Sequence, residues 1–157
     1  REVRALHNEA KLSAGKADWS YKLDREATAV TIEVVNSLGK VVQVEKASGD
    51  DLKAGDHTYS WNGKDRTGAQ LPNGDTYTLR ITAKDSAGAT VGVTNFIKGV
   101  VTGVEQTDGK TLITINGVQI GWEKVTSIAE APQQTAAADT NPDNSDSDNP
   151  PSEQAAT

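Results

Sequence analysis

The sequence contains no cysteine and no methionine, and only 4% of its 157 residues are aromatic. Without cysteine, disulfides and thiolate metal sites are excluded. Without methionine, Arg1 is not expected to be a translation start, and the chain is expected to be a processed product or a fragment. No apolar run approaches the roughly 20 residues that a membrane helix needs. Because aromatic residues are scarce, the core must be built mainly from valine, isoleucine and leucine.

The net negative charge is unevenly distributed along the chain. The net charge is -6, and subtracting the five carboxylates of residues 131–157, which have no lysine or arginine, leaves -1 for residues 1–130. A nearly neutral body argues against an electrostatic nucleic-acid binder. Residues 131–157 combine proline with small polar residues, so they cannot bury enough apolar area to offset the entropy of ordering. We predict a disordered acidic tail there.

Alternating residues predict strands over most of the chain, and no stretch has helical periodicity. Val30, Ile32 and Val34 alternate with polar residues, which is the period of a half-buried strand. Similar segments recur at residues 42–44, 57–61, 77–83 and 91–93. Their spacing is typical of a β-sandwich.

A second group of strands follows residue 95. Asp108-Gly109 and Asn116-Gly117 are hairpin signals, the latter being the strongest in the chain. Residues 95–130 alone are too few for a stable core without disulfides or metal. We therefore expect residues 1–24, in which Trp19, Tyr21 and Leu23 alternate, to join 95–130 in a small discontinuous barrel, interrupted by a sandwich at 25–94. The alternative is one continuous sandwich with a C-terminal hairpin extension.

Few residues suggest catalysis or metal binding. Only His7 and His57 offer an imidazole base, and neither lies in a recognisable motif. The carboxylates at positions 50, 51 and 56 lack the regular spacing of a calcium loop, so a polar turn is favoured. The three tryptophans, Trp19, Trp61 and Trp122, are expected to be core anchors rather than a carbohydrate platform.

The connection from Trp61 to Tyr77 is the most distinctive segment. It is long and polar, and it contains three glycines. Asn62 and Asp65 are of the type that caps backbone groups in turns. We favour such capping over metal binding, and we expect Trp61 and Tyr77 to anchor the core on either side.

The region contains the pattern Gly55-Asp-His57, Trp61-Asn-Gly63-Lys-Asp65, Gly68, Leu71-Pro72-Asn-Gly74 and Tyr77. This pattern resembles the flagellar hook-capping protein family, also known as the basal-body rod modification proteins. Residue 62 departs from the family pattern, since it is asparagine where aspartate is usual. The flanks at 29–32, 39–42, 99–104 and 125–128 resemble the family too, and the resemblance covers nearly all of residues 1–130. The signature residues, to which a structural role is assigned, are Trp61, Gly63, Asp65, Gly68, Leu71, Pro72, Gly74 and Tyr77.

The resemblance implies an all-β fold in which an immunoglobulin/fibronectin-like sandwich is inserted into a small Tudor-like barrel. It implies a scaffold with no catalytic activity, metal or cofactor, exported through the flagellar type III apparatus. Such scaffolds form an oligomeric cap at the tip of the growing hook, where hook subunits are placed, and need an N-terminal region expected before Arg1. No nucleic acid or membrane partner is implied. The alternative function is a secreted immunoglobulin-like module that binds carbohydrate or a cell surface, which predicts an exposed Trp61 or Trp122.

Overall fold

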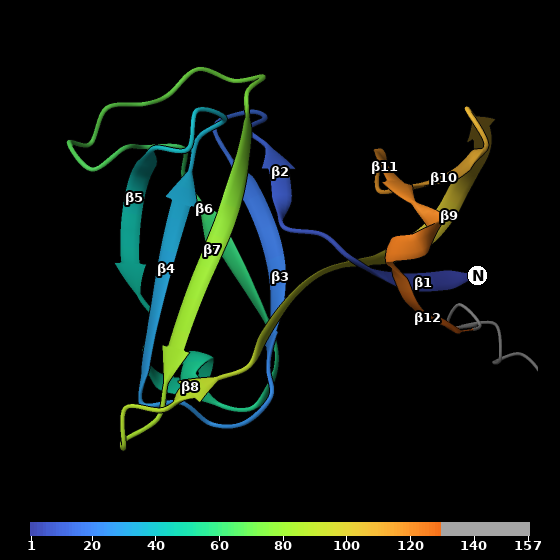
Figure 1. The fold of residues 1–157 in the computed structure, drawn as a ribbon. Helices are drawn as coiled ribbons and strands as arrows, with labels where there is room; N and C mark the ends of the chain where they lie inside the picture. The colour runs from blue at the N-terminus through green and yellow to red at the C-terminus, as the bar shows by residue number, and fades with distance from the viewer. Residues whose placement is uncertain (130–157) are drawn as a thin grey trace, which may run out of the picture.

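The computed structural model describes residues 1–129, which form an all-β fold with two short 3-10 helices (Figure 1). The expected all-β class is thereby confirmed. The predicted tail at 131–157 lies outside the described residues. Within the described part, no helix combines the length and apolar character needed to cross a membrane.

A sandwich of two sheets makes up the larger part of the molecule. In one sheet β3 (Ala17–Leu23) lies between β6 (Gly55–Trp61) and the first residues of β9 (Val93–Thr107). The other sheet has the order β2-β7-β4-β5, with β8 paired to β7. Its strands are β2 (Glu9–Lys11), β4 (Ala29–Val35), β5 (Val41–Lys46), β7 (Thr76–Lys84) and β8 (Thr90–Val91), and the 3-10 helix η1 (Gly49–Leu52) precedes β6.

The sandwich core lies between these sheets and is rich in aromatic side chains. Alternation places one face of each strand inside, as β3 shows with its regular buried and exposed pattern. The core is a single cluster of buried residues: Leu12, Ala17, Trp19, Tyr21, Leu23, Ala27, Val30, Ile32, Val34, Tyr59, Trp61, Tyr77, Leu79, Ala83 and Val91.

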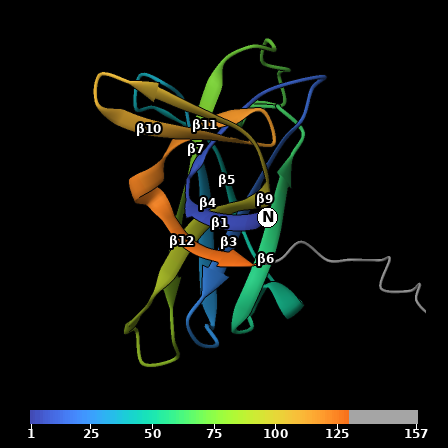
Figure 2. The same cartoon turned by 90° about the vertical axis from the view of Figure 1, so that its right-hand side faces the viewer.

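A small module is built on the second half of β9. It consists of β1 (Glu2–Leu6), β10 (Lys110–Ile115), β11 (Val118–Gly121), the 3-10 helix η2 (Trp122–Lys124) and β12 (Val125–Ala129), in the sheet order β11-β10-β9-β1-β12. Figure 2 shows this module facing the viewer, with β12 beside β1. Its separate core contains only five buried residues: Val3, Ala5, Ile113, Ile115 and Ile120.

The two predicted hairpins of this module are confirmed. Asp108 and Gly109 join β9 to β10 with φ values of 51° and 74°, and Asn116 and Gly117 join β10 to β11 with 52° and 80°. Two successive positive φ values are those of the turn that matches strand twist. Asparagine and aspartate tolerate this conformation, and glycine adopts it without steric cost.

The expectation that residues 17–23 complete the small module is wrong. This segment is β3, whose partners are β6 and the start of β9, and Trp19, Tyr21 and Leu23 belong to the sandwich core. Of the N-terminal residues, β1 alone contributes a strand to the small module. The alternation correctly gave a half-buried strand, but its partner depends on pairing with residues more than 30 positions away.

The expectation that all three tryptophans anchor a core is wrong for Trp122. Strand β11 ends at Gly121, and Trp122 begins η2. The turn into this helix ends the alternation that directs Ile120 inward. The side chain of Trp122 is therefore 48% exposed.

Candidate functional site

Trp61 and Tyr77 anchor the connection between β6 and β7, which we call the 61–77 connection. Trp61 is only 2% exposed, and its ring meets that of Tyr77 edge to face at 4.8 Å between centroids. The indole Nε1 donates a hydrogen bond of 3.0 Å to the carbonyl of Lys64. The polar atom of the buried ring is thus satisfied by the connection itself, as buried tryptophan requires.

Asp65 organises the first turn of the connection. Its Oδ1 accepts hydrogen bonds from the backbone amides of Thr67 and Ala69, at 2.9 and 3.0 Å, and from the Thr67 hydroxyl at 2.7 Å. The Thr67 hydroxyl, followed by the Ala69 amide, holds the pKa of this carboxyl below its ordinary value. Asn62 acts similarly, because its Oδ1 accepts the backbone amide of Lys64 at 3.1 Å. These contacts place the two side chains as turn caps.

The second half of the connection is tied to the segment after β2. The Gly74 amide donates to the Leu12 carbonyl at 2.8 Å, and Asn73 Oδ1 accepts the Gly15 amide at 2.9 Å. Leu71 donates its amide to the Gly63 carbonyl at 2.9 Å and packs against the sandwich core, while Pro72 is exposed. The signature residues therefore lie together in the folded 61–77 connection between β6 and β7.

Gly63 is the most closely packed glycine of the 61–77 connection. Its φ is +76°, and an added Cβ would lie 2.5 Å from Gln70 Nε2 and 3.0 Å from Leu12 Cδ1. Gly63→Ala is expected to lower the free energy of unfolding by about 2–4 kcal/mol, because left-handed backbone strain and overpacking add. Urea unfolding followed by tryptophan fluorescence measures this loss.

Gly68→Ala is the matched control. Gly68 also has positive φ, at +90°, but no atom lies within 4 Å of its added Cβ. This variant is expected to lose only about 1–2 kcal/mol, the backbone term alone. Equal losses in the two variants would refute the close approach at Gly63.

The residues considered for catalysis or metal binding point to different partners. The ring of His57 packs on Tyr21 at 5.2 Å, and its Nε2 lies 2.6 Å from the Lys53 carbonyl. Asp50 pairs with Lys53, and Asp56 with Arg4. Within residues 1–129, no group of three possible ligands gathers in a metal-binding arrangement.

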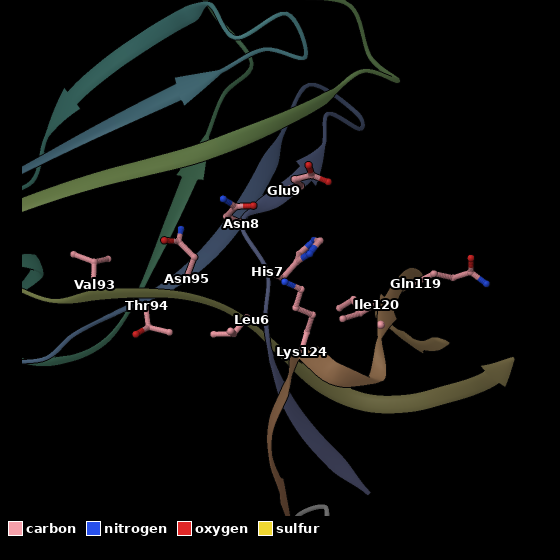
Figure 3. A pocket seen from close by; sticks show the side chains of 11 residues that line it. Leu6, His7, Asn8, Glu9, Val93, Thr94, Asn95, Gln119, Ile120 and Lys124 are labelled. Atoms are coloured by element: carbon pink, nitrogen blue, oxygen red, sulfur yellow. The ribbon is translucent and has the colours of Figure 1, made fainter. Parts of the chain in front are cut away.

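Two grooves, of about 600 and 680 Å³, lie where the sandwich meets the small module. Figure 3 shows the first, with β9 and the 6–9 segment crossing between the modules. Its lining is mainly polar, and His7 borders both grooves. The side chains from the two modules include Glu9, Thr94 and Asn95 on the sandwich side and Gln119, Ile120 and Lys124 on the other.

Exposed apolar side chains are concentrated in the small module. Only one large example lies in the sandwich, Leu38, in the turn between β4 and β5. Sequence reasoning missed this concentration, because it assigned Trp122 to a core. The other large exposed side chains, which we call the exposed apolar set, are Leu6, Val100, Val104, Trp122 and Ile128.

Comparison with known proteins gives consistent matches. A family model described as the FlgD Ig-like domain matches residues 7–93. The basal-body rod modification protein FlgD of Salmonella typhimurium is 36% identical over 64 residues, which are 41% of this chain and 26% of that protein. FlgD of Salmonella typhi gives the same values. The matched region therefore spans about a quarter of the length of these curated relatives.

Two solved structures share the fold. FlgD from P. aeruginosa has a TM-score of 0.62 and 24% identity, covering 82% of this chain and 96% of that chain. FlgD from Xanthomonas campestris, whose structure is described as giving insights into the hook capping essential for flagellar assembly, has a TM-score of 0.61 and 20% identity. That match covers 82% of this chain and 91% of the other.

Proposed function

The chain belongs to the FlgD Ig-like domain family, and from that premise we propose that it is a non-enzymatic scaffold for bacterial flagellar hook assembly. The observation that carries this proposal is the family match over residues 7–93. In this role the protein caps the tip of the growing hook and promotes incorporation of hook subunits. The hook capping described for the Xanthomonas campestris relative supports this role.

The proposed partners are hook subunits and further copies of the same chain in a cap oligomer. The proposed location is the distal end of the growing hook, reached through the flagellar type III apparatus. The scaffold role is supported by the contacts of the groups considered above for catalysis or metal binding. Asp65 caps a turn, His57 contacts the Lys53 carbonyl, and Asp50 and Asp56 are in ion pairs.

The division into domains is also a proposal. A small Tudor-like barrel would be interrupted by the immunoglobulin-like sandwich, as in the discontinuous layout expected from the sequence. Two separate buried clusters and the pairing of β1 with β9 and β12 support the discontinuity. The start of the family match at residue 7 supports a first border just after β1, rather than at residue 24.

Carbohydrate binding is not favoured. A sugar platform needs an aromatic face open to solvent, and Trp61 is buried against Tyr77 and Trp19. Trp122 is exposed, but no second aromatic ring is paired with it in the described part of the chain. Its position within the exposed apolar set instead suits a protein contact, where tryptophan is enriched.

A deletion strain tests the proposed function. Removing the full gene is expected to abolish hooks and swimming while basal bodies remain, because hook subunits would leave the growing structure without being placed. Electron microscopy of isolated basal bodies and a soft-agar motility assay measure this. Normal hooks in the deletion strain would contradict the scaffold role.

The same strain locates the contact surface when complemented with full-length variants. Trp122→Ala is expected to restore motility only weakly if the exposed apolar set contacts hook subunits. Leu38→Ala is the matched control, since Leu38 is 90% exposed but lies on the sandwich. Full motility with a folded Trp122→Ala protein would show that hook subunits do not depend on Trp122 for their contact.

A further inference from the structure

Phe96 lies at the point where the two modules share strand β9. It pairs with Leu6 of β1 on one side and with Ser20 of β3 on the other. Beyond it in sequence, β9 pairs with β1 and β10 of the small module. Residue 96 is therefore the position at which β9 changes from a strand of the sandwich to a strand of the small module.

The junction between the modules around residue 96 is loosely packed. The two grooves of about 600 and 680 Å³ open there, and neither buried cluster extends across it. The chain crosses only through β9 and through the short segment between β1 and β2, whose Asn8 carbonyl accepts the Trp19 indole at 3.0 Å. A two-strand crossing without a shared apolar core leaves the angle between modules weakly fixed.

One side chain bridges the modules at this point. The guanidinium of Arg4, on β1, makes two hydrogen bonds to the carboxylate of Asp56 on β6, at 2.5 and 3.2 Å. On its way it covers the Phe96 ring, with Cζ 3.9 Å from the centroid, and Phe96 is only 6% exposed. A bidentate pair fixes direction as well as distance, and the ring adds a cation–π contact.

This contact is distinctive in the described part of the chain. The other ion pairs there, Arg25–Asp85, Lys53–Asp50, His57–Asp51 and Arg80–Glu33, all lie within the sandwich. Only Arg4–Asp56 joins the two modules, across 52 positions of sequence. The hydrogen bond from Arg4, with Lys98 and Lys22 nearby, keeps the pKa of Asp56 below its ordinary value, so the carboxylate stays ionised.

We infer that Arg4, Phe96 and Asp56 form a latch that fixes the angle between the sandwich and the small module. With the latch closed, the modules move as one body and Phe96 is covered. With the latch open, β9 bends at residue 96, Phe96 becomes accessible, and the grooves change width. This device is independent of whether the protein caps hooks, and it is tested without flagella.

The absence of cysteine allows a direct measurement of the angle. Spin labels are attached to Leu38→Cys, in an exposed turn of the sandwich, and to Lys110→Cys, in the exposed hairpin of the small module. Double electron–electron resonance then gives the distance distribution in the full chain. In Asp56→Asn and in Arg4→Met, this distance distribution is expected to become roughly twice as wide, because more than one angle between the modules is populated.

Three further variants decide what the broadening means. Glu33→Gln breaks an ion pair inside the sandwich, Arg80–Glu33, and is expected to leave the width unchanged. The double variant Arg4→Met/Asp56→Asn is expected to be no broader than either single variant, since both open one latch. Arg4→Lys keeps the charge but loses the bidentate fork, and is expected to give an intermediate width.

An unchanged distribution in folded Asp56→Asn would overturn the latch. Far-ultraviolet circular dichroism and the fluorescence of the buried tryptophans check folding. Arg4 and Asp56 lie in different modules, so damage to one module by one substitution leaves the other variant decisive. Broadening in Glu33→Gln as large as in Asp56→Asn would also overturn the latch, because it would reflect general loosening.

Discussion

Trp61→Ala is expected to lower the free energy of unfolding by about 3–5 kcal/mol, as for other large-to-small changes at buried aromatic positions. The ring is 2% exposed and lies between Trp19, at 6.4 Å between centroids, and Tyr77, at 4.8 Å. The change also leaves the Lys64 carbonyl without its indole donor. Because domains are stable by only about 5–15 kcal/mol, the variant is expected to be largely unfolded on modest warming. Urea titration followed by circular dichroism measures the loss.

Two further substitutions separate packing from the hydrogen bond. Trp61→Phe keeps most of the apolar contact and is expected to lose about 1–3 kcal/mol, from the cavity and the lost indole hydrogen bond. Trp122→Ala is the matched control for removing an indole, and is expected to cost below about 1 kcal/mol because it is half exposed. If Trp61→Ala cost no more than Trp122→Ala, the anchoring role would be refuted, and a binding role for the Trp61 ring would return.

Local signals in the sequence were sufficient for the strands and tight turns. Asn116-Gly117 specifies its hairpin because the two residues tolerate the positive φ values observed. Asp65 and Asn62 cap amides within five positions of themselves, so their roles depend on neighbours that the sequence places beside them. The all-β class follows from the same short-range patterns.

Long-range partners could not be predicted in this way. Alternation in residues 17–23 gives a half-buried strand, but it contains no information about whether β6 or β12 lies beside it. The ion pair of Arg4 and Asp56 joins positions 52 apart and has no local signal. Trp122 shows a further limit, because the alternation of β11 does not indicate that the strand ends at Gly121 and is followed by a 3-10 helix.

Of the two tryptophans that were both expected to anchor a core, Trp61 does so and Trp122 does not. Trp61 lies at the start of a long polar connection, and its ring is buried and its indole N–H is bonded to the Lys64 carbonyl of that connection. Trp122 lies in an ordinary alternating segment, yet it is exposed in a module with few buried residues. Contacts with other proteins are thus better sought on the small module than on the 61–77 connection.

Deleting residues 1–6 is expected to unfold the small module and leave the sandwich folded. β1 is the strand between β9 and β12, so its loss breaks both pairings and removes two of the five residues in the small core, Val3 and Ala5. Figure 1 shows this strand and the N-terminus within the small module, away from the sandwich sheets. The sandwich core contains no residue before Leu12. Hydrogen exchange is expected to give free energies of opening below about 1 kcal/mol at residues 110–128, whereas protection is kept at 29–35 and 77–84.

Deleting residues 1–24 is the informative comparison, because it also removes β2 and β3. β3 lies between β6 and β9, and with the preceding segment it supplies four large side chains to the sandwich core: Leu12, Trp19, Tyr21 and Leu23. Removing a central strand and four large core side chains exceeds the stability of an ordinary domain, so protection is expected to vanish throughout. A border at residue 24 would instead leave the sandwich protected in this truncation. Retained exchange protection at 29–35 and 77–84 would therefore contradict the placement of β3 and restore that border.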